Sequence, residues 1–123
     1  MKVTLLETIT FIINDAPYGG EKPWNALRLA LTFISVAIKS NVNVFLLGDA
    51  VSIAKKGQNT PEGYYNLEKM LTDLIAKGGK VRACGTCLKA RGLSHDDLIE
   101  GVEVGTMMGL ANWVKESGIV LSF

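Results

Sequence analysis

Short apolar segments alternate with helical segments along this chain of 123 residues. Five segments are rich in residues that favour strands: residues 5–14, 42–47, 80–83, 102–104 and 119–123. Most of them are separated by one predicted helix and short connections. This alternation is typical of a parallel sheet covered by helices on both faces. We therefore predict an α/β fold with a mostly parallel five-stranded sheet, in one domain spanning residues 1–123.

The composition favours a buried sheet and excludes several classes of function. Hydrophobic residues make up 48% of the chain, which suggests a buried parallel sheet, an oligomer interface or both. The net charge of +1 is too small to indicate a basic surface that binds nucleic acid or a membrane. The most apolar stretch, residues 26–38, contains Arg28 and is too short to span a bilayer. Glu7 interrupts the first apolar stretch, so no signal peptide is expected.

The helical segments have predicted ends and faces. The first is predicted over residues 23–39, and its broad apolar surface should pack against the sheet and against something else, such as another subunit. Residues 60–62 predict the start of the second helix, which would place Tyr64 on its inner face. The last helix, residues 106–116, is predicted to turn four side chains inward: Met107, Leu110, Trp113 and Val114.

The only two cysteines of the chain, Cys84 and Cys87, follow the third predicted strand. In an open parallel sheet, ligands and chemistry collect at the carboxyl ends of the strands. A short helix is predicted to start directly after Cys84, so unpaired backbone N–H groups would face its sulfur. This setting predicts a lowered pKa for the Cys84 thiol and a nucleophilic thiolate, and the same donors would hold a persulfide anion.

Four neighbours of Cys84 are the candidate supports for such an anion or persulfide. Gly85 and Thr86 belong to the predicted helix start, and Lys89 and Arg91 add positive charge within one or two turns. The alternative is a purely structural role, in which Cys84 is a buried small residue at a strand end.

Other kinds of thiol chemistry fit the same spacing. Cys84 and Cys87 lie one helical turn apart, which admits a reversible disulfide. A structural zinc site needs four ligands, and the chain offers two cysteines and one histidine, His95. No metal or cofactor is therefore expected. Two closely spaced cysteines without a larger disulfide framework fit a reducing cytoplasm better than secretion.

Four segments match, in order and spacing, the pattern of a known family. They correspond to its first strand with a proline/tyrosine/glycine loop, its second strand and turn, the segment of its reactive cysteine, and its final strand: residues 11–19, 45–51, 81–92 and 118–123. On this basis most of the chain resembles the DsrE/DsrF-like family, which includes the YchN-like proteins and the TusD-like sulfur relay subunits.

The resemblance implies a flavodoxin-like, three-layer α/β/α sandwich that assembles into trimers or hexamers. It also implies a cysteine that accepts sulfane sulfur as a persulfide, and the alignment places this role on Cys84. Cys87 lies where many members have a small apolar residue, so its role is open between a resolving thiol, a second carrier and packing.

The expected function is a sulfur carrier or sulfurtransferase subunit in the cytoplasm, which takes sulfur from a donor protein and passes it to an acceptor protein. The first alternative is a dithiol/disulfide redox protein that uses Cys84 and Cys87 together. The second is a non-catalytic oligomeric binding protein whose cysteines are structural.

Overall fold

The computed structural model describes residues 7–123 and confirms the parallel α/β fold. Five strands form one sheet in the order β4-β3-β2-β1-β5, and all neighbouring strands run parallel. The elements in chain order, with η for short 3-10 helices, are β1 (Thr8–Ile13), α1 (Lys22–Ile34), β2 (Asn41–Leu46), η1 (Gly48–Ala54), α2 (Leu67–Ala76), β3 (Lys80–Cys84), α3 (Gly85–Ala90), η2 (His95–Asp97), β4 (Val102–Gly105), α4 (Met107–Glu116) and β5 (Ile119–Ser122).

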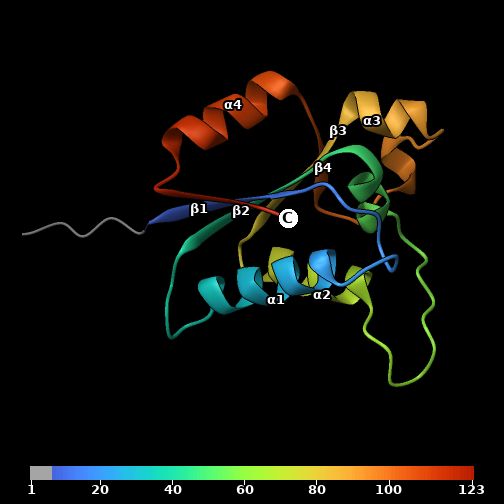
Figure 1. The fold of residues 1–123 in the computed structure, drawn as a ribbon, viewed down its shortest axis with the longest axis horizontal. Helices are drawn as coiled ribbons and strands as arrows, with labels where there is room; N and C mark the ends of the chain where they lie inside the picture. Colours follow the sequence, from blue (N-terminus) through green and yellow to red (C-terminus); the bar gives the residue numbers. More distant parts are fainter. Residues whose placement is uncertain (1–6) are drawn as a thin grey trace, which may run out of the picture.

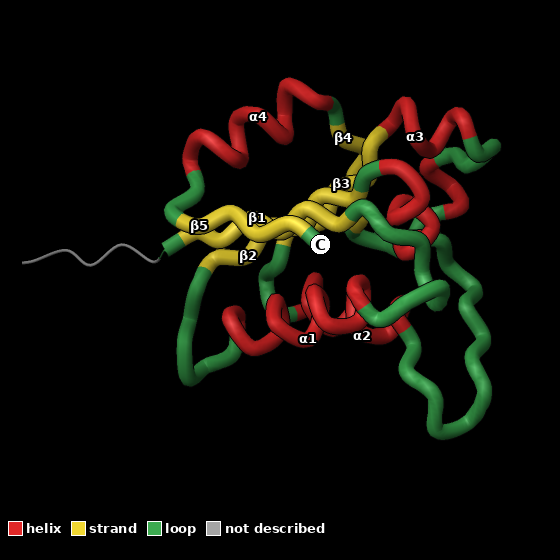
Figure 2. The backbone as a smooth tube through the Cα atoms, in the orientation of Figure 1, coloured by secondary structure: helices red, strands yellow, loops and turns green. Residues whose placement is uncertain are grey.

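Helices cover both faces of the sheet, which is the predicted three-layer arrangement (Figures 1 and 2). Helices α1 and α2 pack against each other on one face, and α4 crosses the opposite face. Helix α3 lies at the edge of the sheet where β3 ends. Within residues 7–123, no helix combines the length and the apolar character needed to cross a membrane.

The central strands β1 and β2 are buried on both faces. Phe11 and Phe45 are among their fully buried side chains. Two polar side chains share this environment, and they bond to each other: Asn43 Nδ2 donates to Thr10 Oγ1 at 3.3 Å. Thr10 Oγ1 also lies 2.6 Å from the hydroxyl of Ser117, which follows α4. Such pairing compensates for the loss of water around buried polar groups, so the core tolerates them.

Helix α1 is shorter than predicted. It ends at Ile34 rather than at residue 39, because Ser35 takes an extended conformation and its hydroxyl donates to the carbonyl of Thr32 at 2.7 Å. Lys39 closes the turn that follows, with a positive φ of 60°. The broad apolar surface of α1 is shared between the sheet and α2, so much of it is covered within this chain.

Helix α2 starts later than predicted, at Leu67 rather than after residues 60–62. Its N-cap is Asn66, whose side chain accepts a backbone N–H from the first turn and thereby fixes where the helix begins. Tyr64 therefore precedes the helix. Its side chain is 48% exposed and stacks on Tyr65, with the ring centroids 4.5 Å apart, so the predicted inward orientation is wrong.

The ends of the chain differ from the prediction in smaller ways. The first strand was expected over residues 5–14, and β1 covers Thr8–Ile13, while residues 5 and 6 lie outside the described residues. In α4, Leu110 and Trp113 are buried as predicted, but Met107 and Val114 are exposed. Helix α4 begins next to β4, the edge strand, so its first turn has no further strand to cover.

Gly105, the last residue of β4, is predicted to be intolerant of a side chain. A Cβ built there lies 2.7 Å from Phe45 Cε2 and 3.1 Å from Arg82 Cβ. Because this overpacks the core, we expect Gly105→Ala to lower the free energy of unfolding by about 1–3 kcal/mol, measured by denaturant titration.

Gly19→Ala is the matched control, because no described atom lies within 4 Å of a Cβ at that position. We expect it to change the free energy of unfolding by less than about 1 kcal/mol. Equal effects of the two substitutions would contradict the packing of Gly105 described above.

Candidate functional site

Cys84 and Cys87 lie at the carboxyl edge of the sheet, as the sequence predicted. Cys84 ends β3, pairs in register with Gly105 of β4, and occupies the N-cap position of α3. Cys87 lies on the first turn of α3. The spacing of the two residues thus places them on either side of one strand-to-helix junction.

The two thiols are neighbours at this junction and differ in burial. Both are free, and Cys84 is only 8% exposed while Cys87 is partly exposed. Cys84 is the N-cap of α3 and Cys87 lies on its first turn, and each thiol changes the pKa of the other. The backbone N–H of Gly48, in the turn after β2, donates a hydrogen bond to Cys87 Sγ at 3.2 Å.

Burial raises the pKa of the Cys84 thiol above its usual value. The neighbouring Cys87 side chain raises the pKa further, while the backbone N–H groups of Cys87 and Thr86 lower it by less. The predicted lowering of the Cys84 pKa is therefore wrong. The physical reason is that removal of a sulfur anion from water outweighs the few donors offered by the helix start.

The pKa of Cys87 is lowered instead. The largest cause is the neighbouring Cys84 side chain, and the Gly48 N–H and the charge of Arg91 lower the pKa further against the effect of burial. Of the two thiols, Cys87 is the one that loses its proton at lower pH. The pair thus consists of a buried thiol and a neighbouring sulfur that readily becomes a thiolate.

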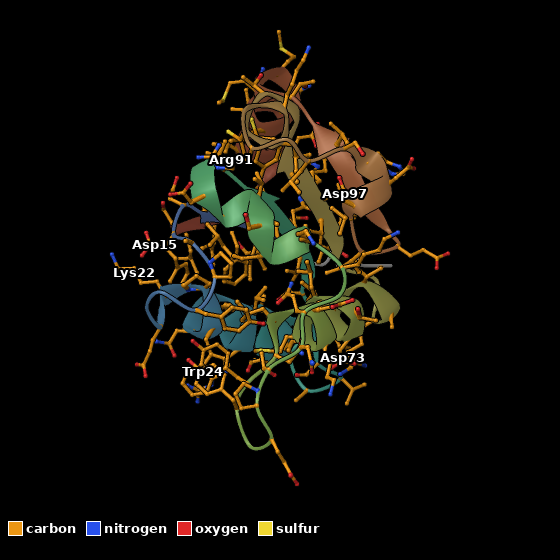
Figure 3. The ribbon with its side chains drawn as sticks, turned by 90° about the vertical axis from the view of Figure 1, so that its right-hand side faces the viewer. Asp15, Lys22, Trp24, Asp73, Arg91 and Asp97 are labelled. Atoms are coloured by element: carbon orange, nitrogen blue, oxygen red, sulfur yellow. The ribbon has the colours of Figure 1, made fainter. Side chains whose placement is uncertain are left out.

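Arg91 joins the site from the end of α3. Its guanidinium binds the carboxylate of Asp49, with Nη2 at 2.7 Å and Nε at 3.0 Å from Oδ1, and Nη1 donates to the carbonyl of Cys87 at 3.0 Å. In Figure 3, which faces this edge of the sheet, Arg91 lies beside η1. Lys89, the other predicted cation, is exposed and contributes to neither thiol pKa shift.

A largely apolar hollow of about 490 Å³ opens beside the two cysteines. Its lining residues come from the ends of β2, β3 and β4 and from the helices that follow β3 and β4: Leu47, Cys84, Gly85, Thr86, Cys87, Val104, Gly105, Thr106 and Met107. Gly85 and Thr86 are the two predicted supports among them. The β4 side was missed by the sequence analysis, although its position at a strand end was a usable signal.

The rim of this hollow carries exposed apolar side chains on the α4 side. Met107 is 62% exposed and Met108, its neighbour in the first turn of α4, is 73% exposed. Val104 is also exposed. An apolar rim around a reactive group favours contact with another protein surface.

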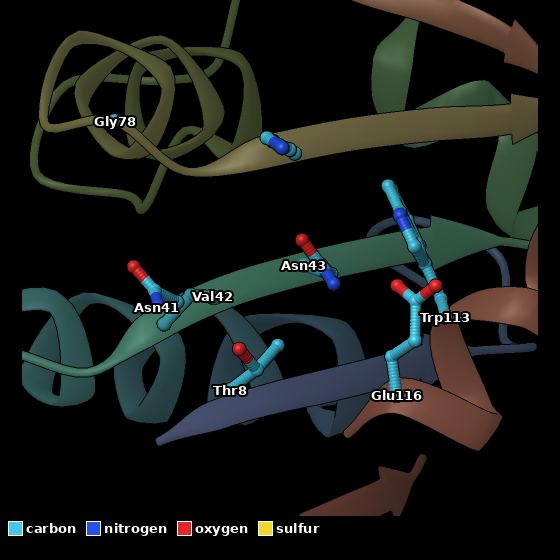
Figure 4. A pocket seen from close by; sticks show the side chains of 8 residues that line it. Thr8, Asn41, Val42, Asn43, Gly78, Trp113 and Glu116 are labelled. Atoms are coloured by element: carbon cyan, nitrogen blue, oxygen red, sulfur yellow. The ribbon is translucent and has the colours of Figure 1, made fainter. Parts of the chain in front are cut away.

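A second hollow, of about 250 Å³, lies at the opposite edge of the sheet and is polar (Figure 4). Thr8 and Asn41, the first residues of β1 and β2, line it together with Asn43, and Trp113 and Glu116 reach it from α4. It shares no lining residue with the cysteine hollow.

His95 and the acidic residues form no metal cluster within the described residues. In residues 7–123, no group of three or more His, Cys, Asp and Glu side chains is arranged to hold a metal ion. His95 begins η2, and Ser94 and Asp97 form a capping box at its start.

The fold and the site together define a parallel α/β/α protein with two neighbouring free thiols at the carboxyl edge of its sheet. The chain belongs to the DsrE/DsrF-like family, whose sequence model matches residues 7–123. The resemblance found in the sequence is thereby confirmed.

Three relatives place the chain within this family. An uncharacterised protein of Methanopyrus kandleri is 48% identical over 118 residues, which is 96% of this chain and 95% of the relative. Protein YchN of Escherichia coli is 40% identical over 118 residues, and the match spans 96% of this chain and all of YchN. Its crystal structure matches this structure with a TM-score of 0.90. The intracellular sulfur oxidation protein DsrF of Allochromatium vinosum is 29% identical over 100 residues, which is 78% of this chain and 71% of DsrF.

The shifts in pKa predict that Cys87 alkylates at lower pH than Cys84, because the thiolate is the reactive form. Iodoacetamide labelling between about pH 6 and 10, with each thiol assigned by fragment-ion mass spectrometry, measures both profiles. Cys84→Ala removes the largest cause of the lowered Cys87 pKa, so the alkylation of Cys87 should move to higher pH. Slow alkylation of both thiols at neutral pH would instead favour the reading in which the cysteines are structural.

Arg91→Gln tests the effect of the guanidinium, and Lys89→Gln is its matched control. Each variant removes one positive charge from the same end of α3. We expect Arg91→Gln to move the Cys87 profile to higher pH, because the guanidinium lowers that pKa. Lys89→Gln should leave the profile in place. A shift of the same size in both variants would mean that general charge, and not the position of Arg91, controls the thiol.

Proposed function

We propose that this protein is a sulfur carrier or sulfurtransferase subunit that holds sulfane sulfur as a persulfide on Cys84. The observation that carries the proposal is the placement of Cys84 and Cys87 at one helix start, where both line an open hollow at the carboxyl edge of the sheet. Similarity to a protein named for intracellular sulfur oxidation supports the choice of sulfur as the transferred group.

The pair offers a way to use a thiol whose own pKa is raised. As Cys84 Sγ bonds to the sulfane sulfur of a donor persulfide, its proton moves to Cys87 in its thiolate form, since the pKa of Cys87 is the lowered one of the two. The bond between the donor and its sulfane sulfur breaks, and the donor leaves as a thiolate. Gly85 and Thr86 line the hollow in which the added sulfur atom would lie.

Delivery to a partner protein is the second half of the proposed function. The hollow opens to the surface, and the exposed side chains of Val104, Met107 and Met108 surround it with an apolar rim. Donor and acceptor proteins would dock on this rim. We place the protein in the cytoplasm, where a reducing environment keeps two neighbouring thiols free.

A dithiol/disulfide redox function is the second candidate. The position of the two cysteines at the N-cap and on the first turn of α3 favours it, because this spacing admits a disulfide. Cys87→Ser separates the two functions. A redox pair loses its activity in this variant, whereas a carrier still loads sulfur on Cys84.

Persulfide trapping tests the carrier function. After incubation with a low-molecular-weight persulfide and rapid alkylation, we expect a Cys84 adduct about 32 Da heavier, the mass of one sulfur atom. Cys84→Ser should lose the adduct, and Cys87→Ser should keep it. No adduct on Cys84 with any persulfide, polysulfide or protein donor would contradict the proposal.

Assembly into a trimer or hexamer is also proposed. Several apolar side chains outside the core are available for an interface, among them Leu29, Val36, Ile38, Ile119 and Val120. Burial of such side chains between subunits is favourable. Light scattering at micromolar concentration should give the mass of a trimer or a hexamer, and a monomer mass would refute the assembly.

A further inference from the structure

The two cysteines are placed so that sulfur bound to Cys84 stays next to Cys87. Cys84 is the N-cap of α3, Cys87 lies on the first turn of the same helix, and both residues line the same hollow. In a persulfide on Cys84, the present Sγ becomes the inner sulfur and keeps its bond to Cβ. Cys87 Sγ therefore faces the inner sulfur of the persulfide.

Cys87 is held in this position by contacts from outside its own helix turn. The Gly48 N–H binds its sulfur at 3.2 Å, and Arg91 binds its carbonyl at 3.0 Å while being anchored on Asp49. These contacts fix the sulfur beside Cys84, and the Gly48 N–H also stabilises its negative charge. Simple packing of a small residue would require neither a donor on the sulfur nor an anchored guanidinium on the carbonyl.

We propose that Cys87 discharges the persulfide on Cys84 as free hydrosulfide, so that the protein also acts as a persulfide reductase. The inference rests on the proposed function, since it needs sulfur on Cys84. A persulfide that meets no acceptor protein is removed by the protein's own second thiol.

The step is a thiol–disulfide exchange within one chain. Cys87 first gives its proton to solvent, its thiolate attacks the inner sulfur, and a bond forms between Cys84 Sγ and Cys87 Sγ. The bond from the inner to the outer sulfur breaks, and its electron pair leaves with the outer sulfur, which keeps its proton and departs as hydrosulfide. Both cysteines end in a disulfide. Hydrosulfide is a better leaving group than an alkyl thiolate because it is the weaker base.

A second reaction restores the site. A dithiol reductant attacks the Cys84–Cys87 disulfide, returns both protein thiols and becomes a disulfide itself. The disulfide can form because two cysteines that bracket the first turn of a helix are close enough to bond. With a persulfide as the oxidant and a dithiol as the reductant, the complete cycle converts sulfane sulfur into sulfide.

The test uses one equivalent of cysteine persulfide with the wild-type protein and with Cys87→Ser, in samples quenched over time with acid. Released sulfide is measured, and trypsin frees residues 83–89, which contain both cysteines. In the wild type, we expect a peptide about 32 Da heavier to appear first. It should then give way to one about 2 Da lighter than the dithiol, as sulfide appears.

Cys87→Ser should load sulfur more slowly, because it lacks the proposed proton acceptor. Once formed, its heavier peptide should persist, and sulfide release per loaded protein should be at least about tenfold slower than in the wild type. Cys84→Ser should form no internal disulfide. Circular dichroism checks that both variants are folded. The time order of the two masses in the wild type tests the proposal without any variant.

A persulfide on Cys84 that persists equally in the wild type and in Cys87→Ser, with no internal disulfide, would overturn the inference and leave the carrier function intact. Absence of any persulfide on Cys84 in both proteins would refute the carrier function, and this inference with it.

Discussion

Burial of the central strands on both faces is the constraint on which the rest of this structure depends. Once Phe11, Phe45 and their neighbours fill the space between the helix layers, no open face of the sheet is left for polar chemistry. Reactive groups must then lie at the ends of the strands. The parallel register brings the ends of β2, β3 and β4 together, so that Gly48, Cys84 and Gly105 meet although they are far apart in the sequence.

The same burial makes the two thiols unequal. Burial at the strand end raises the pKa of Cys84. Cys87 lies one turn further along, where neighbouring groups lower its pKa. A pair of this kind divides the work between its members, since the buried sulfur is shielded from solvent and the outer one can hold a proton or a negative charge. The sequence predicted a lowered pKa for Cys84, whereas in the structure it is the pKa of Cys87 that is lowered.

The sequence predicted those features that depend on local pattern. The five strands, the parallel arrangement, and a helix starting at Cys84 follow from periodicity and from the order of segments. The sequence did not predict features that depend on residues far apart along the chain. The Gly48 N–H and the pairing of Arg91 with Asp49 set the environment of Cys87, and neither is visible in a Cys-x-x-Cys motif. The exposed orientation of Met107 depends on its place beside the edge strand, which periodicity does not report.

The sheet also narrows toward its margins, since β1 and β2 have six residues each while the outer strands β4 and β5 have four. A short outer strand leaves few free N–H and C=O groups, so it is a poor template for a strand from another chain. This geometry protects a protein rich in β-forming residues from sheet extension and fibril-like growth. It directs association toward contacts between side chains, which can be specific and reversible.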